Sequence, residues 1–289
     1  MILMKPTYSI IGPGRLGRAL ARAIAASGAR VAAIGSRRRV RLRGLSAPIT
    51  LDPATAASAA DVVLITTGDS DITTVVDRIL SSRNSLDGRV FLHCSGILTS
   101  DVLEPLRSRG ASIGSLHPLQ TFPLPPPPPA IFHRTTFYFE GDTKARSAAR
   151  RLVKRLGSSL HLLRPGDKIL YHAAAVMVSN YQVAIFDGAL KLLGRCGFSR
   201  ADGRKMLSPL AARTTKNLTA RDPSSALTGP IARGDLEIVR MHVGQIRKRS
   251  PDLLPLYCQL GLQAVAVARC RGRNRRLDEI ARTLRGAAG

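Results

Sequence analysis

A glycine-rich turn near the start of the chain is the first candidate for chemistry. The sequence at 12–17 is GPGRLG, which matches the pattern G-x-G-x-x-G. The turn follows an apolar segment at 8–11 that predicts a strand, and it precedes a segment with helical spacing. This is the setting in which the pattern binds a pyrophosphate. Gly12 would permit the tight turn, Gly14 would let the backbone approach the phosphates, and Gly17 would let helix and strand pack closely.

The helix that begins directly after this turn would strengthen an anion site. Arg15 and Leu16 are its expected first residues, and the free backbone N–H groups of a first helical turn point at a bound anion. A glycine turn that binds nothing is the alternative interpretation. The order of strand, turn and helix favours the pyrophosphate site.

The end of the second expected strand, at 30–34, indicates which dinucleotide would bind. A carboxylate near this point would bind the ribose hydroxyls of NAD, but no acidic residue occurs before Asp52. Ser36 and Arg37 are found there instead, and a hydroxyl beside a guanidinium suits a 2′-phosphate. These residues therefore predict NADP, or NADPH in its reduced form, with Arg37 as the main contact.

Residues at the ends of other expected strands would line the rest of the site, because ligands lie beyond the carboxyl ends of parallel strands. Thr66, Thr67 and Ser95 are small and would leave room for the ribose and nicotinamide. His117 would face the reacting centre, although a histidine that only caps the strand end is an equal alternative. Gln120, in the same segment, is a candidate for substrate binding.

A long helix expected at 167–195 carries polar residues among apolar ones. Lys168, His172 and Ser179 fall within roughly 40° of arc at about 100° per residue, and Ser179 is a substrate-binding candidate. Asn180 lies about 80° from His172 and shares the broader face. Polar groups in apolar surroundings need partners, which a substrate would supply. The alternatives are backbone hydrogen bonds for His172 and Asn180, and a solvated side chain for Lys168.

A second polar segment lies at 226–235. Arg233 could clamp a substrate carboxylate with two hydrogen bonds, and Thr228 is a further substrate-binding candidate. Asp235 stands where a helix is expected to begin, so an N-cap is the alternative role for its side chain. The segment therefore indicates an acid as substrate.

Alternating strand and helix patterns in the first half of the chain would position these residues. Strands are expected at 8–11, 30–34, 61–66, 89–93, 112–116, 136–140 and 160–163. Helical patterns between several of them predict βαβ units and a parallel α/β sheet. Later residues have helical spacing over 167–195, 201–219, 235–248 and 251–269. We therefore expect a nucleotide-binding domain over 1–165, a helical domain over 166–270 and a basic C-terminal arm over 271–289.

The composition excludes several classes of protein. Of the 289 residues, 44% are hydrophobic and 22% charged, which indicates a globular protein rather than a disordered or collagen-like one. The formal net charge is +25. Because the arginines are spread along the whole chain, they favour solvated faces, and we expect no nucleic-acid partner.

The cysteines and apolar runs indicate where the protein would act. Four cysteines without zinc-ligand spacing predict free thiols in a reducing cytoplasm and no metal site. No apolar run reaches the about 20 residues that span a bilayer, so no membrane association is expected.

Four features together resemble one known family. They are the glycine turn, the segment HPLQTF at 117–122, the helix from His172 to Asn180 and the stretch at 227–235. The chain resembles the Rossmann-like oxidoreductases with a helical C-terminal domain of unknown function (number 2520), a family similar to ketopantoate reductase, pyrroline-5-carboxylate reductase and the β-hydroxyacid dehydrogenases. The resemblance implies a Rossmann-type parallel sheet domain followed by an all-helical domain like that of 6-phosphogluconate dehydrogenase. It also implies a homodimer formed through the helical domain.

The resemblance implies residue roles as well. Ketopantoate reductases use a lysine and an asparagine on the first long helix of the second domain, and Asn180 can take the place of that asparagine. The position one turn earlier is Val176, so His172 or Lys168 must substitute for the lysine.

The expected reaction is hydride transfer between NADPH and a small carbonyl or imine acid. His172 is the expected proton donor because a histidine has a pKa near neutrality, with His117 and Lys168 as alternatives. Asn180 would hydrogen-bond the reacting oxygen, and Arg233 would hold the carboxylate. The alternative function is a regulatory or scaffold protein that binds NADP without turnover.

Overall fold

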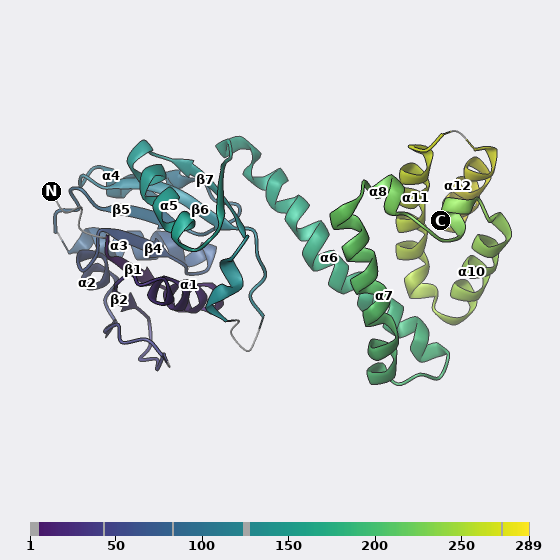
Figure 1. The fold of residues 1–289 in the computed structure, drawn as a ribbon, viewed down its shortest axis with the longest axis horizontal. Helices are drawn as coiled ribbons and strands as arrows, with labels where there is room; N and C mark the ends of the chain where they lie inside the picture. Colours follow the sequence, from purple (N-terminus) through teal and green to yellow (C-terminus); the bar gives the residue numbers. More distant parts are fainter. Residues whose placement is uncertain (1–5, 43, 83, 124–127, 273, 289) are drawn as a thin grey trace. The chain divides into compact units, whose positions relative to one another are not determined.

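The computed structural model describes residues 6–42, 44–82, 84–123, 128–272 and 274–288 (Figure 1). The chain forms two compact units, residues 1–179 and 180–289, and each is described by itself. The division falls within helix α6 (Lys168–Arg195), later than the domain boundary expected after residue 165. The two positions differ because the first turn of α6 contacts the sheet of the first unit.

An eight-stranded sheet forms the centre of the first unit, in the order β3-β2-β1-β4-β5-β6-β7-β8. Its strands are β1 (Tyr8–Ile11), β2 (Val31–Gly35), β3 (Ile49–Thr50), β4 (Val62–Ile65), β5 (Val90–His93), β6 (Ser112–Pro118), β7 (Thr136–Gly141) and β8 (Ser159–Leu162). The order of the first six strands is typical of dinucleotide-binding sheets. The expected α/β class with a mainly parallel sheet is confirmed.

One strand pair departs from the expected parallel arrangement. β6 and β7 are antiparallel, with Leu116 opposite Phe139, whereas the other neighbouring pairs are parallel. A parallel return needs a crossover, usually a helix, and the described part of the β6–β7 connection contains only the short 3₁₀ helix η3 (Pro129–Phe132). Helix α5 (Thr143–Arg155) supplies such a crossover for β8.

Two short elements lie outside the sequence-based expectations. β3 has two residues and α2 (Pro53–Ser58) has six, both too short for a hydrophobic period to identify. Asp52 caps α2, since its carboxylate accepts hydrogen bonds from the N–H groups of Ala54 and Thr55. The dipeptide Asp52-Pro53 is a helix-start signal that could have revealed this helix.

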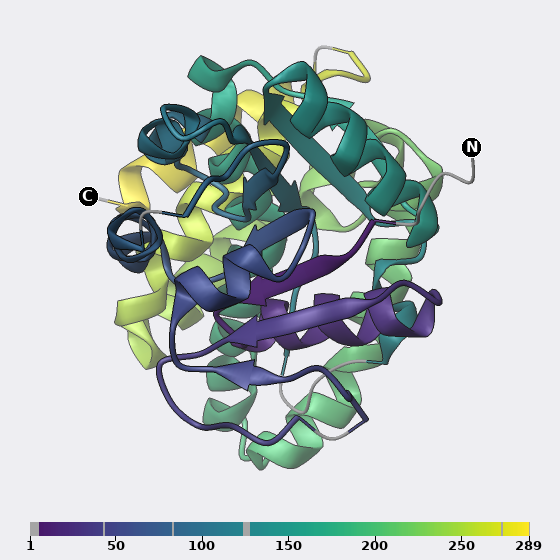
Figure 2. The same ribbon diagram turned by 90° about the vertical axis from the view of Figure 1, so that its left-hand side faces the viewer.

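Helices cover both faces of the sheet (Figures 1 and 2). α1 (Arg15–Ala26) and α5 pack on the face that carries Ile10, and α3 (Ile72–Ser81) packs with α2 and α4 (Glu104–Arg107) on the face that carries Ile11. Ile10 and Ile11 are neighbours whose side chains enter opposite cores, as strand geometry requires. The sheet is therefore buried on both sides.

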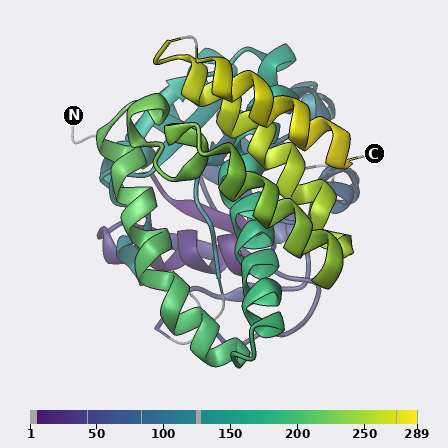
Figure 3. The same ribbon diagram turned by 90° about the vertical axis from the view of Figure 1, so that its right-hand side faces the viewer.

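The second unit is helical among its described residues, as expected. Besides the end of α6 it contains α7 (Arg200–Ala220), α8 (Pro223–Ala226), α9 (Pro230–Arg233), α10 (Leu236–Arg249), α11 (Leu254–Arg269) and α12 (Arg275–Ala288). Helices α10, α11 and α12 lie side by side and share one core (Figure 3). The segment expected as a basic arm thus contributes Leu277, Ile280 and Leu284 to this core, while Arg275, Arg276, Arg282 and Arg285 are exposed.

One helical stretch meets the length and composition of a membrane span, which differs from the expectation. Within Pro165–Arg195, a window of 18 residues has a mean hydropathy of 1.3, because an average tolerates the polar residues that interrupt the apolar run. One such helix is weak evidence, since core helices pass the same test. Within this stretch Lys168 is buried, and Asp187 pairs with Lys191 and Arg200.

The packing of α12 predicts a stability effect. Leu284 is fully buried, and a Cβ on Gly261 of α11 would lie 2.8 Å from its Cδ1 atom. We expect Leu284→Ala to lower the free energy of unfolding by about 2–5 kcal/mol, since it leaves a cavity, as measured by urea denaturation. Arg285→Ala, an exposed change on the same helix, should cost less than about 0.5 kcal/mol. Equal losses of unfolding free energy in the two variants would show that α12 is not part of the core.

Candidate functional site

The glycine turn has close backbone contacts that leave no room for side chains. Gly12 has a φ of +95°, and a Cβ there would lie 2.7 Å from Thr67. A Cβ on Gly17 would overlap the carbonyl oxygen of Gly12. A Cβ on Gly14 would meet nothing within 4 Å. Gly12 and Gly17 are therefore required by packing, whereas Gly14 exposes the backbone to open space.

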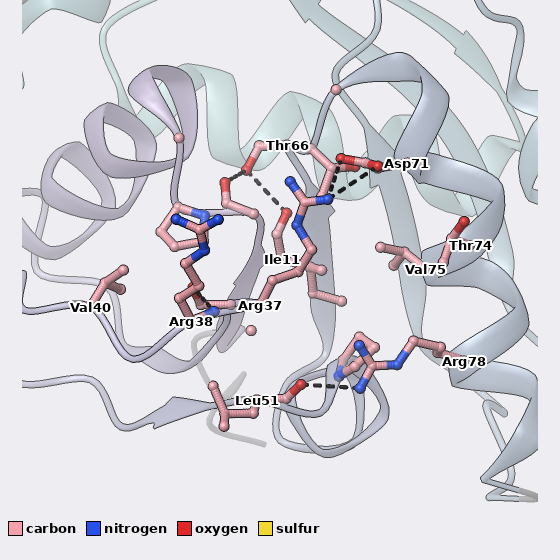
Figure 4. Close-up of a pocket in the computed structure, with 18 residues that line it drawn as sticks. Ile11, Arg37, Arg38, Val40, Leu51, Thr66, Asp71, Thr74, Val75 and Arg78 are labelled. Atoms are coloured by element: carbon pink, nitrogen blue, oxygen red, sulfur yellow. Dashed lines mark hydrogen bonds and ion pairs between the residues drawn. The ribbon is translucent and has the colours of Figure 1, made fainter.

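A cavity of about 690 Å³ opens beside this turn (Figure 4). Six residues expected to bind the cofactor line it, namely Gly12, Gly14, Ser36, Arg37, Thr66 and Thr67. Of the other four, Arg15, Leu16 and Gly17 form the first turn of α1 next to the cavity, and Ser95 lies outside its lining. The carboxyl ends of β1, β2 and β4 thus meet at one cavity.

The two threonines at the end of β4 have different surroundings. The hydroxyl of Thr66 donates to the carbonyl oxygen of Gly12 at 2.6 Å and also lies 3.2 Å from that of Ile11. Its contribution is therefore to hold the glycine turn. Among the described residues the buried hydroxyl oxygen of Thr67 has no hydrogen-bond partner, although buried polar groups normally have one. The same holds for the buried hydroxyls of Tyr8 and Ser9, so this feature does not by itself indicate a ligand.

Three guanidinium groups give the cavity a positive rim. Arg37 and Arg38 follow β2, and Arg78 comes from α3. Arg37 pairs with Asp71, at 3.3 Å between Nη1 and Oδ2, and its side chain is 79% exposed. Arg78 donates to the carbonyl oxygen of Leu51 at 3.1 Å. Asp71 is the one carboxylate among the lining residues, so the rim favours phosphate groups.

These observations fit a dinucleotide in the cavity. The helix N-cap, Gly14, supplies no side-chain hydrogen bond to α1, so the first N–H groups of α1 are left for an anion. Val40, Leu51 and Val75 add an apolar wall that suits a flat base. The arginine rim adds charged donors that suit a phosphorylated nucleotide.

A second polar cluster lies where α6 begins, and Lys168 is its centre. The side chain of Lys168 is 3% exposed, which excludes the solvated alternative. Its ammonium group donates to the Ser115 hydroxyl at 2.5 Å and to the Ser95 carbonyl oxygen at 3.3 Å, and it lies 3.8 Å from Oε1 of Glu140. Burial lowers the pKa of Lys168, and the nearby Glu140 carboxylate opposes this shift.

Two further side chains from the same turn of α6 reach the sheet. The hydroxyl of Tyr171 and Nδ1 of His117 are hydrogen-bonded at 2.9 Å. The ring centroids of His117 and His172 are 6.1 Å apart. A Cβ on Gly96 would lie 2.5 Å from Cδ2 of His172 and 3.1 Å from Nε2 of His117. The structure thus brings His117 and His172 together beside Gly96.

Burial keeps the histidines beneath this cluster neutral. Burial, together with the nearby Lys168 charge, lowers the pKa of His117 to about 4 and that of His93 to about 3. His93 accepts the Ser95 N–H at Nδ1, and its Nε2 lies 3.1 Å from the Thr99 carbonyl oxygen, so the proton is on Nε2. Burial also raises the pKa of the Tyr171 phenol, which therefore stays protonated.

Gln120 has a local structural role in the first unit. Its amide nitrogen donates to the Ile131 carbonyl oxygen at 3.2 Å, and its amide oxygen accepts the Thr121 N–H at 2.8 Å. The side chain thus fixes the loop after β6.

Sequence reasoning missed two residues of these regions, Arg78 and Glu140. Arg78 is a single basic residue on an amphipathic helix, and Glu140 is an acidic residue inside a strand, so neither belongs to a motif.

Three expected substrate contacts belong to the second unit: Asn180, Thr228 and Arg233. Nε of Arg233 lies 2.8 Å from Oδ2 of Asp235. Asp235 occupies the N-cap position of α10, but its side chain makes no capping hydrogen bond. The carboxylate instead orients Arg233. Ser179 is the last residue of the first unit, and its approach to a substrate stays a prediction.

Solved structures share this fold over nearly the whole chain. A Bacteroides fragilis protein provisionally named an NADP oxidoreductase is 22% identical, with a TM-score of 0.73 over 90% of this chain and 98% of that one. A reductive aminase from Aspergillus terreus, in complex with NADPH and ethyl levulinate, is 18% identical, with a TM-score of 0.66 over 96% and 99% of the two chains. Pyrroline carboxylate reductase from Plasmodium falciparum, with NADP bound, is 12% identical, with a TM-score of 0.58 over 98% and 100%.

Family comparisons divide the chain in the same order as the fold does. No curated protein matches the sequence. Residues 4–118 match the family model of the Rossmann-like domain, and residues 135–264 match that of the domain of unknown function DUF2520. The two matches, a Rossmann-like domain followed by DUF2520, are the ones that the resemblance predicted.

Proposed function

We propose that the protein is an NADPH-dependent oxidoreductase that reduces a small carbonyl or imine acid. The observation that carries this proposal is the cavity beside the glycine turn, with the uncapped start of α1 and a rim of three arginines. The likeness to solved structures that contain NADP or NADPH supports it. Ketopantoate and pyrroline-5-carboxylate are the first substrates to test, because the resembling families act on them.

Residues of the first unit would hold the cofactor. Gly12 and Gly14, with the first N–H groups of α1, would bind the pyrophosphate. Ser36 and Arg37 would bind the 2′-phosphate, since a guanidinium matches a phosphate with two hydrogen bonds. The chemistry that NADPH supplies when bound is hydride transfer.

The histidines beside Gly96 would supply the proton that the substrate takes up together with the hydride. His172 would donate it to the reduced oxygen or nitrogen of the substrate. His117, neutral above about pH 4, would act as a hydrogen-bond partner. Lys168 is enclosed by protein partners, which favours His172 as the donor. Arg233 and Asn180 would hold the acid group and the reacting atom, as the sequence predicts.

The arginine rim predicts how the protein chooses its cofactor. Arg37→Gln should weaken NADPH binding about 10–100-fold, because charge-assisted bonds to the 2′-phosphate are lost, and should change NADH binding less than about threefold. Isothermal titration calorimetry measures both. Arg39→Gln is the control, because Arg39 is an exposed neighbour outside the cavity lining. Equal losses for the two nucleotides would contradict a 2′-phosphate site at Arg37.

The proposed proton donor predicts a separation of binding from turnover. His172→Ala should bind NADPH as the wild type does, and it should lose about 100-fold or more in kcat, since general acid catalysis contributes about 10²–10⁴-fold. The assay is NADPH consumption with ketopantoate, pyrroline-5-carboxylate and related keto acids and imines. His242→Ala, in the second unit, is the control. A wild-type protein that binds NADPH but turns over none of these substrates would favour the regulatory or scaffold alternative.

A homodimer is part of the proposal, supported by apolar side chains on α6 and α7. Exposed fractions of 64–77% are found for Ile169, Leu170, Met177, Val178, Val183 and Leu210, whereas monomers rarely expose large apolar patches. Light scattering should give twice the mass of one chain. Val178→Glu should weaken self-association about tenfold or more, because it buries a charge, and Lys191→Glu should not. A wild type that stays monomeric at high concentration would refute the dimer.

A further inference from the structure

The start of α6 is held on the sheet by polar and aromatic contacts. The residues that face the sheet, Lys168, Tyr171 and His172, are spaced i, i+3 and i+4 and so share one side of the helix. The apolar residues between them, Ile169 and Leu170, are 72% and 77% exposed. These two residues do not pack on the sheet, so this turn is placed by the polar contacts of Lys168 together with the packing of Tyr171 on Tyr138, whose ring centroids are 4.4 Å apart.

The partner of Lys168 is a carboxylate that is equally buried. Glu140 is 6% exposed. Its Oε1 accepts the Ser100 N–H and its Oε2 accepts the Ser100 hydroxyl, both at 2.7 Å. The carboxylate is thereby fixed on β7 before it meets Lys168. Together with the contacts of Lys168 to Ser95 and Ser115, this pair joins α6 to β6, β7 and the loop after β5.

The same helical turn carries the histidine that would serve the reaction. His172 lies one turn after Lys168, and its ring sits against Gly96, close to His117. A displacement of the first turn of α6 would therefore move His172 away from His117. Neither Glu140 nor Lys168 lines the nucleotide cavity, so such a displacement would leave the residues that line this cavity in place.

We propose that Glu140 is a positioning residue: through Lys168 it holds the first turn of α6 so that His172 faces His117 beside Gly96. The role of these histidines in catalysis rests on the proposed function, whereas their placement by Glu140 does not. An ordinary structural ion pair is the competing explanation, because buried pairs can often be replaced by uncharged groups without loss of stability.

Several titratable groups surround His117 and Lys168 and bear on the test. They are Asp69, His93, Cys94, Tyr138, Glu140, Tyr171 and His172. The Lys168 cation lowers the pKa of His117. Removal of that cation should therefore raise the pKa of His117, so that its protonation begins at a higher pH.

The test compares Glu140→Gln, Lys168→Met and their double variant in the full-length protein. Histidine ring resonances are followed by NMR against pH. The resonances of His117 and His172 should shift in all three variants, and those of His133 and His242 should not. In Lys168→Met the pKa of His117 should rise, because the neighbouring cation is lost. Asp167→Asn is the matched control, because Asp167 precedes Lys168 and pairs with the exposed Arg164.

Measurements of Tm and kcat distinguish a positioning role of Glu140 from a merely structural role. The double variant should recover the Tm lost in Glu140→Gln, yet its kcat should stay about 10–100-fold low, since small misplacements of catalytic groups are costly. Its KM for NADPH should stay within about twofold. Wild-type resonances of His117 and His172 in the three variants, or a kcat that recovers with Tm, would overturn the proposal. Failure of the wild type to bind NADPH would instead defeat the proposed function, and the NMR comparison would still decide the role of Glu140.

Discussion

The contact between the glycine turn and helix α1 is the constraint on which the nucleotide cavity depends. The backbone of Gly17 approaches the carbonyl oxygen of Gly12 too closely for any side chain. Thr66 then donates its hydroxyl to the same carbonyl group. Because β4 thereby holds the turn that follows β1, the carboxyl ends of both strands are fixed at one edge. The cavity lies where these ends meet the end of β2.

The two polar regions of the first unit, the cavity rim and the start of α6, differ in how far their charged groups are exposed to solvent. At the cavity, cations stand exposed and face solvent, so their charge is available to an incoming anion. At the start of α6, a cation and a carboxylate are both removed from water and satisfied by each other and by serines. Separating the members of such a pair costs several kcal/mol. The first region is therefore suited to exchange of ligands, and the second to a fixed geometry.

Local sequence signals predicted most of the sheet and the cavity, because the relevant residues follow strands directly. The glycine turn, Ser36 and Arg37 each stand at a strand end, where topology alone brings them together. Contacts between distant segments were not predictable in this way. The burial of Lys168 depends on Glu140, which lies on the antiparallel strand β7, and no local pattern distinguishes such a lysine from a solvated one.

Two other residues show the same limit of local reasoning. Gln120 serves its own loop through a contact with Ile131 that a motif cannot reveal. Asp235 was expected to cap a helix, and its carboxylate instead pairs with Arg233.

The pairing of Arg37 with Asp71 leaves the rim of the cavity open to the exchange of one anion for another. Before a nucleotide arrives, a carboxylate already occupies one side of the guanidinium. An exposed pair of this kind is worth about 0–1 kcal/mol, so a doubly charged phosphoryl group can displace Asp71 cheaply, whereas a plain ribose hydroxyl lacks the charge to do so. Under the proposed function, a preference for NADPH over NADH would thus arise from competition between Asp71 and the 2′-phosphate for Arg37, and salt would weaken both interactions.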